Sequence, residues 1–195
     1  MNKLIDLGCH MFEGLNTLLN NGVIDSSYSV YCFEPNPNVF PRTKESLEET
    51  SAKFQNLYLH NCAVSDRDGV ITFNLDQSKT NQACNILENP PPKDVVWGGS
   101  YTWTQISVNS VSAKTLLKMC DIQHGDKVKI KCDIEGAEFV FLSDLLKCDD
   151  LSCISEIMIE WHERFWYPNH EVKEQEKKEL IRQLTERDIL VSCWF

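Results

Sequence analysis

The chain has 195 residues, of which 42% are hydrophobic and 25% are charged, the ordinary balance of a soluble globular domain with a packed core. Its formal net charge of -10 argues against a nucleic-acid-binding protein, because phosphate contacts need clustered lysine and arginine. No apolar run approaches the roughly 18 residues of a membrane-spanning helix, and the start of the chain does not read as a signal peptide. We therefore expect a cytoplasmic protein with no membrane span.

Strand-like and helix-like segments alternate along the chain. Short apolar or β-branched runs predict strands at 3–7, 29–33, 57–63, 70–75, 105–111, 127–133, 154–161 and 189–195. Helical spacing of apolar residues, or helix-compatible composition, predicts helices at 12–21, 42–54, 112–120, 136–147 and 171–187. This alternation predicts an α/β fold, a mostly parallel sheet with helices on both faces. We expect a single domain over 1–195 with an irregular insertion at about 76–104.

The cysteines fit a reducing compartment. There are nine of them, an odd number, and no Cys-x-x-Cys pair occurs. Several lie in apolar strand-like runs, for example Cys32 and Cys132. We expect buried, unpaired thiols rather than a disulfide framework or a zinc site.

The carboxyl ends of the first two predicted strands carry residues suited to a nucleotide-like ligand. Ligands of open α/β sheets bind at the carboxyl ends of the strands. Asp6 and Gly8 end the first strand, where a glycine lets the backbone turn sharply and the next helix offers free N–H groups. Glu34 ends the second strand, and a carboxylate there typically accepts hydrogen bonds from both hydroxyls of a ribose. The full Gly-x-Gly-x-x-Gly pattern is absent.

A second group of charged residues follows the strands at 127–133 and 154–161. Asp133 lies in the run Lys131-Cys132-Asp133-Ile134-Glu135-Gly136-Ala137-Glu138 and is expected to face the same crevice as Gly8. The next strand ends in Glu160-Trp161-His162, and His162 can act as a general base near neutral pH.

The irregular insertion contains three aromatic residues. Trp97, Tyr101 and Trp103 either wall a sugar-binding pocket, since sugar rings stack on aromatic faces, or pack against one another.

These motifs together resemble the FkbM-type S-adenosylmethionine-dependent methyltransferases. The matching pieces span nearly the whole chain: Ile5-Asp6-Leu7-Gly8, Phe33-Glu34-Pro35-Asn36-Pro37, Asn61-Cys62-Ala63-Val64-Ser65-Asp66 with Asp68-Gly69, Ser110-Val111 with Thr115-Leu116-Leu117, Lys129 to Glu138, and Ile159-Glu160-Trp161-His162. The Lys-x-Asp-Ile-Glu-Gly-Ala-Glu and Phe-Glu-Pro pieces are the more specific. In the first turn the family commonly carries Gly-Ala-Asn-x-Gly, where this chain has Gly8-Cys9-His10-Met11-Phe12.

The resemblance implies a Rossmann-like class I methyltransferase fold, here short at both termini. It also implies S-adenosylmethionine as the methyl donor and O-methylation, often of a sugar hydroxyl in a glycan or glycosylated metabolite. Carried over to this chain, the cofactor-binding residues are Asp6, Gly8, Cys9 and His10 at the methionine end, Glu34 and Pro35 at the ribose, Ala63 and Val64 near the adenine, and Asp133 beside the reacting centre. Only one strand follows the last helix, so a homodimer through that sheet edge is a further expectation.

For the reaction, our hypothesis is that His162 or Asp133 is the base. Glu135, Glu138 and Glu160 then orient the hydroxyls of the acceptor. A second hypothesis is a divalent cation held by Asp133, Glu160 and His162, ligand types that suit Mg²⁺ or Mn²⁺.

Two alternatives from other classes stay open. One is a degenerate methyltransferase fold that binds S-adenosylmethionine or a nucleotide without turnover, which the altered first turn favours. The other is a Rossmann-type dehydrogenase, against which the missing glycines count.

Overall fold

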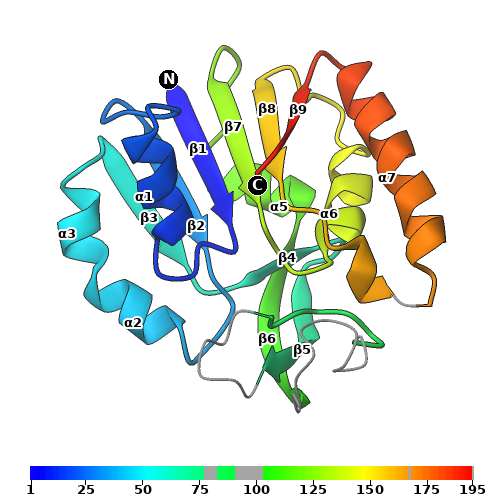
Figure 1. Cartoon of the computed structure of the whole chain (residues 1–195). Helices are drawn as coiled ribbons and strands as arrows, with labels where there is room; N and C mark the ends of the chain where they lie inside the picture. The colour runs from blue at the N-terminus through cyan, green and yellow to red at the C-terminus, as the bar shows by residue number, and fades with distance from the viewer. Residues whose placement is uncertain (77–82, 91–102, 167, 195) are drawn as a thin grey trace.

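The computed structural model describes residues 1–76, 83–90, 103–166 and 168–194, and the statements below refer to these ranges. Its centre is a six-stranded sheet in the order β3-β2-β1-β7-β8-β9 (Figure 1). The strands are β1 (Asn2–Leu7), β2 (Ser29–Phe33), β3 (Asn56–His60), β7 (Lys127–Cys132), β8 (Ile154–Ile159) and β9 (Leu190–Cys193). Every adjacent pair is parallel. The expected α/β fold with a mostly parallel sheet is confirmed.

Helices cover both faces of this sheet, so the apolar residues of its strands are buried on either side. Leu4 of β1 packs in one cluster with Leu15 and Leu18 of α1 (Glu13–Asn20). The next residue, Ile5, points to the opposite face. There it joins a larger cluster with side chains of α5 (Ala113–Met119), α6 (Glu138–Leu145) and α7 (His170–Thr185).

The remaining helices are short. The segment expected to be one helix at 42–54 forms two, α2 (Phe40–Glu45) and α3 (Leu47–Ser51), which meet at Ser46. A 3₁₀ turn, η1 (Glu163–Trp166), follows β8. No helix within the described ranges is long and apolar enough to cross a membrane.

A second sheet of three strands lies beyond the carboxyl ends of the large sheet (Figure 1). Its order is β4-β6-β5, with β4 (Ala63–Ser65) parallel and β5 (Gly69–Asp76) antiparallel to β6 (Trp103–Ser112). The expected strand at 57–63 is therefore wrong as a single element, since it divides between the two sheets. Between the two strands, the side-chain amide of Asn61 donates to the Glu34 carbonyl over 2.8 Å, at the point where the chain leaves the large sheet.

The large sheet ends at β9, which pairs with β8 alone among the described strands. The expected homodimer through this edge stays a prediction. All nine cysteines are free thiols, and six of them are buried. Burial was wrongly expected for Cys193, which is exposed on the edge strand β9.

Candidate functional site

A cavity of about 360 Å³ opens at the carboxyl ends of β1, β2 and β7, where the two sheets face each other. This volume is within the range of pockets that hold small molecules. Most of the residues predicted from the sequence line it: Gly8, Cys9, His10, Glu34, Pro35, Ala63, Val64, Asp133, Glu135, Glu160 and His162. They come from strand ends far apart in the chain, which the parallel sheet brings to one edge.

The turn after β1 is shaped by a close approach to β7. Gly8 has φ 74, and a Cβ at this position would lie 1.9 Å from the carbonyl oxygen of Asp133. The amides of Gly8 and Cys9 both donate to the carbonyl of Phe33, over 3.0 and 3.2 Å. Only glycine fits here, because any side chain would push the two strand ends apart.

In the same turn, two residues other than glycine adopt the left-handed backbone conformation. His10 has φ 43 and Phe12 has φ 66, and these are the places where the resemblance has Asn and the second Gly. The Phe12 side chain is 1% exposed and packs in the α1 cluster. Thr43 Oγ1 donates to the His10 carbonyl over 2.6 Å. Packing and this hydrogen bond therefore hold a conformation that costs about 1–2 kcal/mol per non-glycine residue.

Glu34 stands at the tip of β2 with its carboxylate held from the protein side. Oε2 accepts from the His10 amide over 3.0 Å, and Oε1 accepts from the Asn36 amide over 2.8 Å. Each oxygen keeps a second lone pair for a ligand. Burial raises the pKa of Glu34 to about 6, although the two amides oppose this rise.

Lys131 is a cavity residue that sequence reasoning did not assign to the site. Its ammonium lies 3.1 Å from Asp6 Oδ1 and 3.4 Å from Asp133 Oδ2, and it donates to the Gly8 carbonyl over 3.1 Å. Burial alone would lower the pKa of Lys131, but Asp6 and then Asp133 raise it above its ordinary value. The alternation of side chains along a strand could have revealed Lys131, because it lies two residues from Asp133 and therefore on the same face.

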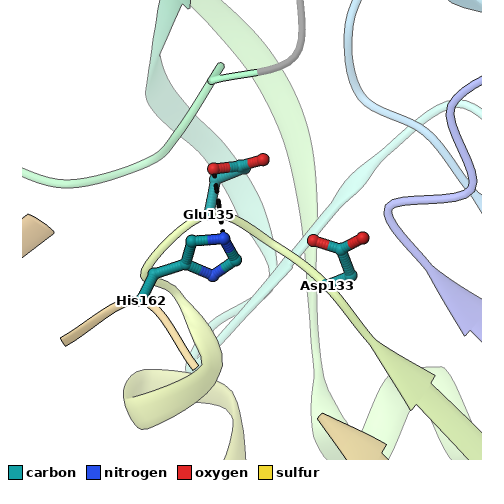
Figure 2. A group of neighbouring side chains, drawn as sticks. All are labelled: Asp133, Glu135 and His162. Atoms are coloured by element: carbon teal, nitrogen blue, oxygen red, sulfur yellow. Dashed lines mark ion pairs between the residues drawn. The ribbon is translucent and has the colours of Figure 1, made fainter. Parts of the chain in front are cut away.

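His162 is enclosed by three carboxylates at the other end of the cavity. Its Nδ1 lies 2.9 Å from Glu138 Oε1, and its Nε2 lies 3.4 Å from both Glu135 Oε2 and Glu160 Oε1. Figure 2 shows Asp133 and Glu135 beside the ring, on the loop that follows β7. One ligand atom from each of Asp133, Glu135 and His162 lies within 4.8 Å of the others.

Burial and the neighbouring charges shift the pKa values of His162 and of the carboxyl groups around it, some upward and one downward. Burial disfavours a charged His162 ring, but Glu138, together with Glu160 and Glu135, raises the pKa of His162 to about 11. Burial raises the pKa of Glu135 to about 8 and raises that of Asp133. The contact with His162 lowers the pKa of Glu160. The ring and Glu160 therefore form a charged pair next to two carboxyls that are poorly hydrated.

The small sheet supplies a wall of the cavity that the sequence did not reveal. Phe73 of β5 and the segment Cys84-Asn85-Ile86 line it. Asn85 pairs with Asn74 through two backbone hydrogen bonds of 2.7 and 3.1 Å. Asn36 Nδ2 donates to the sulfur of Cys84 over 3.2 Å, so the wall is tied to the loop that carries Glu34.

Some predicted site residues lie outside the cavity. Asp6 is fully buried beneath it against Lys131, and Glu138 is fully buried behind His162. Trp103 begins β6, where it is paired with Asp76, and does not line the cavity. Trp97 and Tyr101 lie outside the described residues.

Comparison with known proteins gives one family. The methyltransferase FkbM domain matches residues 21–188, which include Glu34, Asp133 and His162. The turn at Gly8 precedes the matched region. No curated protein and no solved structure matches the chain significantly. Since the match covers well over half of its length, the chain belongs to the FkbM methyltransferase family.

Proposed function

We propose that the chain is an S-adenosylmethionine-dependent O-methyltransferase that acts on a sugar hydroxyl of a glycan or glycosylated metabolite. The observation that carries this proposal is the single cavity in which Glu34 and the Gly8 turn meet Asp133, Glu160 and His162. The end of the cavity at Glu34 suits a nucleoside, and the end at Asp133 and Glu160 holds carboxylates that can accept a proton. The family match supports methyl transfer and does not support the dehydrogenase alternative.

The cavity residues fit S-adenosylmethionine by their chemistry. Glu34 has an acceptor site left on each oxygen, which suits the two ribose hydroxyls. Ala63, Val64, Phe73 and Ile86 provide apolar surface for a flat base. Asp133 lies at the acidic end, which suits a positively charged sulfonium. When bound, this cofactor supplies a methyl group on a sulfonium that is ready for displacement by an oxygen.

The chain's own residues would then align the acceptor and accept its proton. Alignment of two reactants supplies a large part of the rate acceleration in such displacements. Asp133, Glu135 and Glu160 offer carboxylate oxygens that bind several hydroxyls at once, which favours a sugar over a mono-alcohol. Asp133 or Glu160 takes the proton in place of His162, because the neighbouring carboxylates keep the His162 ring protonated by raising its pKa to about 11. His162, fixed by Glu138, positions the acceptor. The net charge of -10 counts against a nucleic acid as the acceptor.

The test has two steps, binding and transfer. Titration calorimetry with S-adenosylmethionine should show one binding site, which Glu34→Gln weakens and which Glu49→Gln, an exposed residue of α3, leaves unchanged. Incubation with cofactor labelled in the methyl group and a panel of mono- and oligosaccharides should then label an acceptor. Absence of binding by the wild-type chain would contradict the proposal.

A second candidate is a module that binds S-adenosylmethionine or a nucleotide without turnover. The departure at Phe12, which replaces glycine at a left-handed position, favours it. Cofactor binding without label transfer to any acceptor in the panel would support this candidate. For both candidates the proposed compartment is a reducing one such as the cytoplasm, which the free cysteines favour.

A further inference from the structure

The loop after β7 and the end of β8 bring together two partly exposed carboxylates and a buried histidine. Asp133, Glu135 and His162 each present one ligand atom, and these atoms lie within 4.8 Å of one another. Glu160 adds a carboxylate oxygen 3.4 Å from His162 Nε2. The His162 side chain is 1% exposed and that of Glu135 is 18% exposed, so water screens this charge poorly.

His162 is oriented in the manner of a metal ligand. Its Nδ1 faces Glu138 Oε1 at 2.9 Å, and Nε2 is directed at the other carboxylates (Figure 2). In the cation-free chain the imidazole is protonated, and a bound cation would replace the proton on Nε2. Glu138 is itself fixed, because Oε1 also accepts from the amides of Ile134 and Gly136 over 3.2 and 3.1 Å. Histidines that bind metal ions usually have their second ring nitrogen held by a carboxylate in this way.

One oxygen of Glu135 gives a further observation. Its Oε2 is buried, is 3.4 Å from His162 Nε2, and has no hydrogen-bond partner among the described residues. A buried carboxylate oxygen without a hydrogen bond is costly unless a ligand or ion satisfies it. The 3.4 Å separation is about 0.4 Å wider than the roughly 3.0 Å between neighbouring ligands at about 2.1 Å from one octahedral ion.

The local charge favours a cation as well. Three carboxylates, those of Glu135, Glu138 and Glu160, lie within 3.4 Å of the His162 imidazole, and an oxygen of Asp133 lies within 4.8 Å of it. Lys131 is 3.4 Å from Asp133 but is shared with the buried Asp6. An excess of negative charge therefore remains next to the cavity.

We propose that Asp133, Glu135 and His162 bind a divalent cation of the Mg²⁺ or Mn²⁺ class at the cavity wall. Two carboxylates and one imidazole suit Mn²⁺, and a thiolate, which would favour Zn²⁺, is not among the ligands. The cation ligand that the sequence hypothesis assigned to Glu160 is therefore Glu135. Glu160 lies beside the site, where its carboxylate can accept the proton of the acceptor hydroxyl. The position of the cation lets it bind an acceptor hydroxyl and acidify it. That catalytic role rests on the proposed function, whereas the occupancy of the site does not.

The experiment measures cation binding by the full chain without cofactor or acceptor. Mn²⁺ is titrated and free Mn²⁺ is followed by electron paramagnetic resonance, with Mg²⁺ as competitor. We expect one site, and a tenfold or greater loss of affinity, on the order of a lost ligand, in Asp133→Asn, Glu135→Gln and His162→Asn. Asp149→Asn, an exposed residue after α6, is the matched control and should bind like the wild type.

Glu138→Gln tests the orientation of His162 separately. As a positioning residue, it should lower Mn²⁺ affinity by roughly 10–100-fold while leaving S-adenosylmethionine affinity unchanged. Circular dichroism identifies any variant that fails to fold, and Glu135→Gln, at a partly exposed residue, is the variant expected to keep its fold. Wild-type protein that binds no Mn²⁺ at about 1 mM, the weak end of divalent sites, overturns the proposal. So does a Glu135→Gln variant that binds Mn²⁺ as tightly as the wild type. Neither result bears on cofactor binding, so the proposed function fails or stands by its own test.

Discussion

A Cβ on Gly8 would lie 1.9 Å from the carbonyl oxygen of Asp133, so the ends of β1 and β7 touch at a point where no side chain fits. Gly8→Ala should lower the free energy of unfolding by more than ~2 kcal/mol and weaken cofactor binding, since strain and a backbone clash add. Urea unfolding and calorimetry measure these effects. Gly22→Ala is the matched control: Gly22 has φ 69 with no atom within 4 Å of its Cβ position, so only the ~1 kcal/mol of strain remains. Equal losses in the two variants would contradict the steric argument.

At Phe12 we expect the glycine variant to be more stable than the alanine variant, the reverse of the order found inside a helix. Phe12→Ala and Phe12→Gly both remove a buried ring, at a cost of about 3–5 kcal/mol. Because the backbone has φ 66, Phe12→Gly should be the more stable of the two by about 1 kcal/mol. In the helical interior, Leu18→Gly should instead be less stable than Leu18→Ala by about 1 kcal/mol. Thermal and urea unfolding of the four variants provides the test.

Glu34 should make both stability and cofactor binding depend on pH. Burial raises its pKa from 4.5 to about 6, so the folded chain keeps a proton that the unfolded chain has released within this window. The contribution of Glu34 to the free energy of unfolding is therefore highest below pH 4.5 and falls by about 2 kcal/mol as the pH rises through about 6. Cofactor affinity should change in the opposite direction, because the ionised carboxylate is the better acceptor.

Glu34→Gln should abolish both effects. At pH 8 it should also weaken cofactor binding by roughly 10–100-fold, the scale of a lost charged hydrogen bond. Calorimetry between pH 5 and 8 compares the variant with the wild type. A wild-type affinity that does not change across this range argues against the contact between Glu34 and the ribose.

Removing one partner of the Asp6–Lys131 pair should lower the free energy of unfolding strongly, whereas removing both charges should lower it only a little. Asp6 is fully buried and neither of its carboxylate oxygens accepts a hydrogen bond, so its only described partner is the Lys131 ammonium at 3.1 Å. Lys131→Met should therefore cost about 3–5 kcal/mol. Adding Asp6→Asn removes the unpaired charge and should recover most of that loss in a double-mutant cycle. A double variant no more stable than Lys131→Met would show that the pairing is not what stabilises this edge.

Sequence patterns predicted the large sheet well because its strands are short apolar runs between turn residues. β2 at Ser29–Phe33 lies where the sequence placed it, and β1 and β7 differ by one residue at an end. The parallel sheet then determines which residues meet at its carboxyl edge, so Gly8, Glu34 and Asp133 were within reach of sequence reasoning.

The parts that sequence patterns missed depend on long-range contacts. The Asn74–Asn85 bridge that positions Cys84 and Ile86 in the cavity wall has no local periodicity. Where the chain leaves the large sheet after His60, the side chain of Asn61 donates to the carbonyl of Glu34, a residue far away in the sequence. The place of Glu138 behind His162, rather than in the cavity, follows from amides of its own loop.

Trp194 lines the cavity, with the Lys131 ammonium 5.5 Å from the centre of its ring. Trp161 and Trp166 instead pack against Phe139 of α6. Indole emission from Trp194 should therefore report directly on what enters the cavity, and the chain carries an intrinsic optical sensor for ligand screening. Trp194→Phe provides the blank for that assay.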